Sequence, residues 1–211
     1  MLDIPFYYKE NPSDVTCAPV CVRMALAYYG LRIELDHVYQ IAHSMGACHY
    51  TLPWGMCLGA AEMGLYAIFV SRSPNELLEM YIDRIAAIAN MPIEQVRSEV
   101  ECELAECREN DKITLVEWEE IFSSVPGNIV AVEAGVVIPT VWWGDVDAHN
   151  IVLTHFDAQH VSYHDPNFPT GRDQRMSAND FFQMWHHENT DNDLLVISRN
   201  ELNLQDLTEE L

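Results

Sequence analysis

Three residues of this 211-residue chain have side chains and surroundings suited to nucleophilic acyl transfer: Cys17, His149 and Asp165. In that chemistry a thiolate attacks a carbonyl carbon, an imidazole moves the proton, and a carboxylate holds the imidazole in one tautomer. Each residue also has an ordinary interpretation. Cys17 can be a small buried hydrophobe, His149 a surface histidine before a strand, and Asp165-Pro166 the start of a turn. The fold decides between the two, because catalysis requires that the three residues meet.

The sequence around Cys17 predicts that its sulfur lies at the N-terminus of a helix. Residues 11–14 (NPSD) are turn formers, and apolar residues then recur at helical spacing from Cys17 to Tyr29 until Gly30 ends the pattern. A helix N-terminus carries a partial positive charge and unsatisfied N–H groups. Both stabilise a thiolate and lower the cysteine pKa.

Residues 149–166 (HNIVLTHFDAQHVSYHDP) predict a β-hairpin that brings His149 and Asp165 together. A turn centred on Asp157 makes His149 and Asp165 directly opposed, and it gives the hairpin one apolar and one polar face. Opposed residues have Cβ atoms about 4.5–5.5 Å apart, close enough for a carboxylate to accept a hydrogen bond from an imidazole. The same register predicts that three histidines face solvent: His155, His160 and His164.

The elements that must position these residues fall into two groups. The first part of the chain predicts helices and one short buried strand: helices over 17–29, 35–44 and 53–63, and a strand over 66–70. The last part predicts short strands over 128–133, 151–154, 161–164 and 194–198. Helices followed by strands indicate an α+β fold.

Length and charge indicate how these elements are organised. A chain of 211 residues predicts a single domain over 1–211. Residues 74–122 carry thirteen acids against four bases and alternate Leu, Ile and Met with Glu at helical spacing, which predicts an acidic helical insertion. Residues 200–211 resemble an acidic tail.

The formal net charge of -22 argues against nucleic acid and anionic membranes as partners. The longest apolar stretch, Ile129 to Trp143, is interrupted by Glu133 and Pro139 and is shorter than a membrane span. Residues 1–10 (MLDIPFYYKE) lack the basic and apolar regions of a secretory signal, so we expect a cytoplasmic protein. The six cysteines are therefore expected to be free thiols, and the oligomeric state is left open.

Taken together, three passages resemble the bacteriocin-leader-processing cysteine peptidases, which are papain-like double-glycine proteases, and their stand-alone relatives. Residues 16–30 (TCAPVCVRMALAYYG) resemble the family's nucleophile helix, 62–67 (EMGLYA) its helix-to-strand step, and 148–167 (AHNIVLTHFDAQHVSYHDPN) its histidine strand and Asp-Pro. The resemblance implies a papain-like fold, a Cys17-His149-Asp165 triad, a peptide or protein substrate, and no metal or organic cofactor.

Two positions depart from the family pattern. The family usually has Gly after the cysteine, where this chain has Ala18. Six residues before the nucleophile the family carries a Gln whose amide forms the oxyanion hole with the cysteine N–H, and this chain has Asn11. Asn11 keeps the N–H donor on a side chain one methylene shorter. Losing such a donor costs about 2.7–4 kcal/mol of transition-state stabilisation.

Several alternatives stay open at this level. Trp142 and Trp143 can line a substrate groove or pack in the core. The pairs Cys17/Cys21 and Cys102/Cys107, with His186-His187, have spacings near those of zinc ligands, although both pairs fall on predicted helices. A peptide-binding relative with weak catalysis, or an acyltransferase or deamidase that uses the same triad, would carry the same residues.

Overall fold

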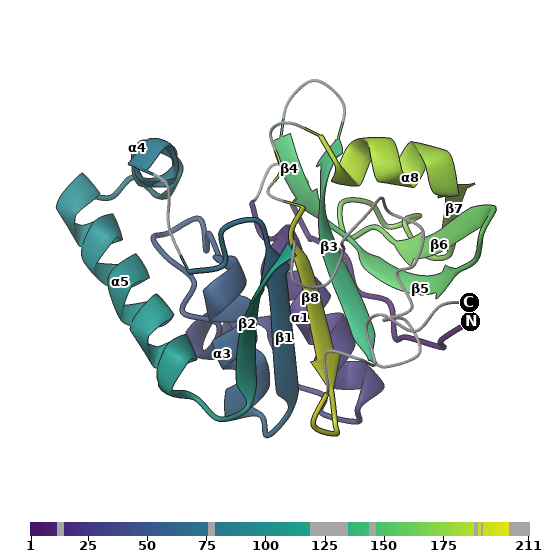
Figure 1. The fold of residues 1–211 in the computed structure, drawn as a ribbon, viewed down its shortest axis with the longest axis horizontal. Helices are drawn as coiled ribbons and strands as arrows, with labels where there is room; N and C mark the ends of the chain where they lie inside the picture. Colours follow the sequence, from purple (N-terminus) through teal and green to yellow (C-terminus); the bar gives the residue numbers. More distant parts are fainter. Residues whose placement is uncertain are drawn as a thin grey trace.

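The computed structural model describes residues 1–11, 15–75, 79–118, 135–143, 147–187, 190 and 192–202. Within these residues the chain forms a mixed sheet of eight strands with helices on both faces (Figure 1). The predicted strand over 128–133 and most of the predicted acidic tail lie outside the described residues.

The strands run in the order β2-β1-β8-β3-β5-β6-β7, and β4 pairs with β3 beside this path. Among the strands that the structure describes, only β1 and β2 pair in parallel. The strands are β1 (Tyr66–Ser71), β2 (Ile113–Glu117), β3 (Val136–Trp143), β4 (Asp147–Asn150), β5 (Val152–Phe156), β6 (His160–His164), β7 (Gln174–Ser177) and β8 (Leu194–Ser198).

The helices are α1 (Cys17–Tyr28), α2 (Leu35–Ile41), α3 (Pro53–Glu62), α4 (Glu79–Ala89), α5 (Ile93–Glu109) and α8 (Ala178–Trp185). The first three confirm the sequence prediction, although α2 ends before the left-handed residue His43. Gly30, with φ of +85°, follows α1 in the conformation expected after a helix C-terminus. β7 and α8 were not predicted. The Ser177 hydroxyl caps α8 by accepting the N–H of Asp180.

The helical insertion predicted over 74–122 is wrong at its C-terminal end, because residues 113–117 form β2. This strand pairs in parallel with β1, and parallel neighbours need a crossover connection that is usually helical. α4 and α5 supply that crossover and lie at one end of the molecule, beyond β2 (Figure 1).

The predicted hairpin exists as β5 and β6, but its predicted register is wrong. Leu153 pairs with Tyr163, and a bulge falls between Leu153 and His155. The turn starts at Asp157 and is not centred on it, because the Asp157 carboxylate accepts the N–H groups of Gln159 and His160. The hydrogen bonds of the Asp157 side chain therefore set a strand register that differs from the predicted one.

The prediction that His164 faces solvent is also wrong, because its side chain is 1% exposed. The N-terminal segment covers this side of the hairpin: Leu2 donates its N–H to the Thr154 carbonyl oxygen, and Ile4 is buried there. His155 and His160, near the turn, are half-buried. A contact between distant parts of the chain therefore buries a face that is polar in sequence.

Two apolar clusters hold the sheet between its helices. The larger joins α1 to α5 with one side of the sheet, and its fully buried members include Met24, Leu26 and Ile197. The second joins α8 to the hairpin through Phe181, Trp185 and Leu153. α1 is anchored in the first cluster, so the position of Cys17 is fixed by packing.

Candidate active site

Cys17 is the first residue of α1, as predicted, and its side chain is half-buried. Thr16 precedes it without a side-chain cap, so the first N–H groups of the helix are not occupied by that residue. The Cys17 sulfur therefore lies where the backbone dipoles of the helix favour its anionic form. Like the other five cysteines, Cys17 is a free thiol.

His149 and Asp165 are both buried and share a hydrogen bond of 2.9 Å between Nε2 and Oδ1. The contact is not the direct cross-strand pairing that the sequence suggested. His149 lies on β4, which pairs with β3, and Asp165 follows the end of β6. The bond joins a strand of one hairpin to the loop that leaves the other.

The loop after β6 holds Asp165 firmly. Its N–H donates to the Gly171 carbonyl oxygen at 2.8 Å, and its Oδ1 accepts the N–H of Asn167 at 2.8 Å. Gly171 is needed for this approach, because a Cβ at that position would lie 2.0 Å from the Asp165 carbonyl oxygen. The carboxylate thus has a fixed direction toward His149.

The pKa values of the sulfur and the imidazole move in opposite directions. Burial opposes ionisation of Cys17, but its hydrogen bond to His149 and the charge of His149 outweigh that effect and lower the thiol pKa. Burial also disfavours the imidazolium, yet hydrogen bonds to Asp165 and Cys17 raise the pKa of His149 to about 9. Both shifts favour the thiolate–imidazolium pair over the neutral thiol–imidazole pair.

Cys21, one helical turn further along α1, has the opposite character. Burial and the neighbouring Cys17 and Asp165 charges raise its pKa well above that of a free thiol. Its sulfur donates to the Asn150 carbonyl oxygen at 3.4 Å. Of the two thiols, only that of Cys17 is suited to act as a nucleophile.

Sequence reasoning missed two asparagines that contact the site. The Asn150 Oδ1 atom lies 3.8 Å from the Cys17 sulfur, and its amide nitrogen donates to the Thr140 hydroxyl. The Asn167 amide nitrogen lies 3.4 Å from His149 Nδ1. Their only signal in the sequence is position, one residue after His149 and two after Asp165.

The other predicted site residues are Asn11, Trp142 and Trp143. Asn11 is exposed in the segment before α1, and its assignment to the oxyanion hole stays a prediction. Trp142 is half-buried on β3 and stacks on His187, with ring centroids 5.0 Å apart. The Trp143 side chain lies outside the described residues, so the predicted substrate-lining role of the two tryptophans also stays a prediction.

The zinc alternative gains no support from the positions of its cysteines. Cys102 is exposed and Cys107 is fully buried, so they do not share a face of α5. In the part of the chain that the structure describes, no group of three or more His, Cys, Asp or Glu side chains could hold a metal ion.

None of the helices formed by the described residues has the length and apolar character of a membrane span.

Comparisons with known proteins point to one family. A family model described as Peptidase_C39 like family matches residues 1–190. No curated protein matches the chain. The chain is similar in fold to the peptidase domain of Streptococcus ComA, a bifunctional ABC transporter involved in quorum sensing, with a TM-score of 0.52 and 11% identity over 92% of this chain and 97% of that one.

A second solved structure gives the same result. It is a double glycine motif protease from an AMS/PCAT transporter in complex with the leader peptide, with a TM-score of 0.51 and 13% identity over 94% of each chain. At these identities the similarity concerns the fold, which is that of the papain-like α+β peptidase domains.

Proposed function

The chain belongs to the Peptidase_C39 like family, and from that premise we propose that it is a cysteine peptidase with Cys17, His149 and Asp165 as its catalytic triad. The observation that carries the proposal is the 2.9 Å hydrogen bond between two buried side chains, His149 and Asp165, beside a thiol at a helix N-terminus. The lowered pKa of Cys17 supports the same roles.

The proposed reaction begins with attack by the Cys17 sulfur. Its electron pair forms the S–C bond while the π electrons of the carbonyl move to oxygen. His149 Nε2 is engaged by Asp165, so Nδ1 carries the proton, which passes to the leaving nitrogen as the C–N bond breaks. Water then attacks the thioester, His149 accepts its proton, and the thiolate leaves.

The negative oxygen of each tetrahedral intermediate needs donors. The Cys17 backbone N–H at the start of α1 is one, and the resemblance assigns Asn11 as the side-chain donor. Asp165 orients the imidazole and stabilises its charged form without taking the proton. These roles require no metal or organic cofactor.

We infer a peptide or protein as substrate. One structural relative is a double glycine motif protease in complex with a leader peptide, which makes a peptide with Gly-Gly before the cleaved bond the first substrate to test. The chain's net charge of -22 favours neutral or basic sequences over acidic ones.

The test is incubation with such a Gly-Gly peptide, and in parallel with a mixed peptide library, followed by intact mass measurement. We expect cleaved products and an acyl adduct that is lost in Cys17→Ala. The adduct is retained in Cys48→Ala, which removes another half-buried free thiol. An adduct resolved by amines instead of water would indicate an acyltransferase, and a deamidated peptide would indicate a deamidase. Peptide binding without adduct or product would indicate a binding relative and overturn the proposal.

A further inference from the structure

Lys9 is a buried lysine for which the proposed mechanism has no task. Only 7% of the Lys9 surface is exposed. Lysines are almost never buried to that degree unless they are paired. It lies in the N-terminal segment, eight residues before Cys17. Asn11, two residues further on, is exposed.

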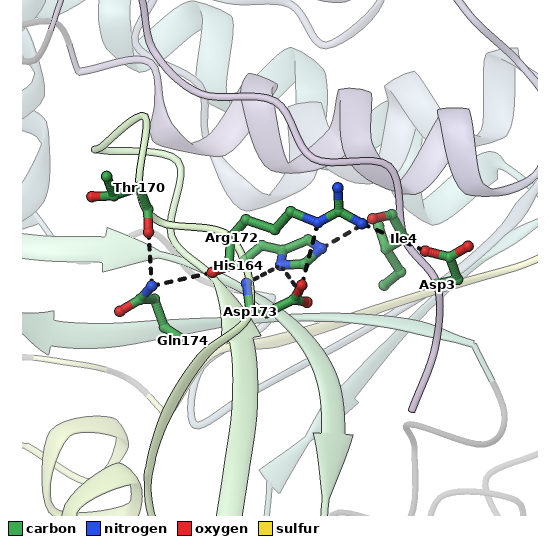
Figure 2. A network of polar contacts seen from close by, with 7 residues as sticks. All are labelled: Asp3, Ile4, His164, Thr170, Arg172, Asp173 and Gln174. Carbon is green, nitrogen blue, oxygen red and sulfur yellow. Dashed lines mark hydrogen bonds and ion pairs between the residues drawn. The ribbon is translucent and has the colours of Figure 1, made fainter.

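The N-terminal segment is tied along the hairpin by His164 (Figure 2). The His164 Nε2–H donates to the Ile4 carbonyl oxygen at 3.0 Å, and Nδ1 accepts the N–H of Asp173 at 3.1 Å. These two hydrogen bonds fix the orientation of a fully buried imidazole. Arg172 adds an ion pair to Asp3 at the surface.

The same segment then reaches the loop that holds Asp165. The Lys9 backbone N–H donates to the Pro166 carbonyl oxygen at 2.7 Å. Pro166 lies between Asp165, which binds His149 Nε2, and Asn167, whose amide lies 3.4 Å from Nδ1. The backbone of Lys9 is therefore anchored to the loop that orients the catalytic imidazole.

The Lys9 ammonium also acts on the sulfur. Burial raises the Cys17 pKa, the hydrogen bond and charge of His149 lower it most, and a backbone contact of Asn150 and the Lys9 charge lower it further. The charges of Lys9 and His149 thus both favour the Cys17 thiolate, and Asp165 pairs with His149. When Cys17 attacks, its negative charge moves onto the substrate oxygen, while the two cations stay in place.

We propose that Lys9 is a catalytic residue of this protein: its ammonium donates the side-chain hydrogen bond of the oxyanion hole, in the role that the resemblance assigns to Asn11. The inference rests on the proposed function. As the S–C bond forms, the carbonyl π electrons move to oxygen, and that oxygen accepts N–H groups from Lys9 and from the Cys17 backbone. Lys9 transfers no proton, and the C=O bond reforms when the leaving nitrogen departs with the proton from His149.

A lysine suits this role on chemical grounds. Its ammonium is a compact charge with three donors on a flexible stem, so it can follow the oxygen from trigonal to tetrahedral geometry. Inside a site that excludes water, a fixed positive charge stabilises a developing negative one more strongly than it would in bulk solvent.

The test compares two reactions of the same sulfur, only one of which forms an oxyanion. p-Nitrophenyl acetate acylates Cys17 through a tetrahedral intermediate, whereas iodoacetamide alkylates it by displacement. Both rates are measured at the plateau of their pH profiles, where a change in the Cys17 pKa has no effect. The variants are Lys9→Met, Lys9→Gln, Asn11→Ala and the control Lys112→Met, which changes the chain's other lysine next to β2.

We expect Lys9→Met to slow acylation about 100-fold, the lower end of the effect of losing one oxyanion donor, with alkylation within about 2-fold of wild type. Lys9→Gln retains an N–H donor and should lose less, and Lys112→Met should lose nothing. An equal fall in both reactions of Lys9→Met, or no fall in either, would overturn the assignment. So would a larger acylation loss in Asn11→Ala.

Failure of the proposed function has a different signature. Wild type and His149→Ala would then react with each reagent at equal rates, because the thiol would not be activated at all. In contrast, a wild type that is faster than His149→Ala, combined with an unaffected Lys9→Met, would overturn only the role of Lys9.

Discussion

In the proposed reaction each member of the triad depends on the next one: Cys17 depends on His149, and His149 depends on Asp165. The sulfur is near its partner His149, whose charge lowers the thiol pKa, and His149 is in turn held and charged by Asp165. Asp165 acts on the thiol through the imidazole. Removing the carboxylate should therefore change the protonation of His149 first and the reactivity of Cys17 as a consequence.

Asp165→Asn should lower kcat/KM and move the alkaline limb of its pH profile to lower pH. The hydrogen bond to Asp165 raises the His149 pKa toward about 9, so its loss lets the imidazolium deprotonate earlier as pH rises. The loss of activity should be about 100-fold or more, as when a triad acid is neutralised. The measurement is a pH profile of peptide cleavage. Asp3→Asn, at a fully exposed carboxylate, is the control, and an alkaline limb that does not move in Asp165→Asn would contradict this role.

At the scale of elements, a buried carboxylate lies where α5 packs on α3. Glu103 is 3% exposed, and within the described residues its Oε2 atom has no hydrogen-bond partner. Burial, with the nearby charges of Glu99 and Glu106, raises its pKa to about 9. Glu103 is therefore protonated at neutral pH in the folded protein.

Glu103→Gln should stabilise the protein at pH 7 by about 1–3 kcal/mol and flatten its pH dependence. The folded state holds a proton that the unfolded chain releases above its ordinary pKa, so wild-type stability falls as pH rises from about 5 to 9. Urea unfolding across that range measures the slope. Glu101→Gln on the exposed side of α5 should keep the wild-type slope, and an unchanged slope in Glu103→Gln would contradict the assignment.

The elements that could be predicted from sequence are those whose signals are local. The apolar stripe of α1 and the Gly30 stop are contained in consecutive residues, and so is the aliphatic run of β8. The predicted hairpin register was wrong because the Asp157 side chain sets the turn. The predicted exposure of His164 was wrong because the N-terminal segment covers its side chain. β2 was hidden within an acidic, helical stretch because its partner β1 is distant in sequence.

The same distinction applies to the candidate site. Cys17, His149 and Asp165 could be proposed because their types, spacing and resemblance coincide. Lys9 could not, because its segment meets the site through a backbone contact to Pro166, more than 150 residues away. Sequence patterns report the faces of elements, whereas contacts between loops follow only from the assembled fold.

At the scale of the whole molecule, the net charge of -22 should select among peptide substrates. A peptide with flanking lysines should have a higher kcat/KM than the same peptide with flanking glutamates, because the field of the protein attracts the first and repels the second. The difference should shrink with added salt, since the screening length falls from about 30 Å at 0.01 M to 3 Å at 1 M. Steady-state rates at two salt concentrations measure this effect. A preference that is independent of salt would show that specific contacts, and not the net charge, decide.

The measurement that tests the account most directly is the rate of iodoacetamide modification of each cysteine at neutral pH, read by peptide mapping. Cys102 is the internal reference, because it is fully exposed while its Glu106 neighbour raises its pKa. We predict that half-buried Cys17 reacts at least about 10-fold faster than Cys102, as expected for a thiol of lowered pKa, and that His149→Ala removes this advantage. Modification of Cys17 no faster than that of Cys102, or a fast rate that survives His149→Ala, would contradict an activated Cys17–His149 pair.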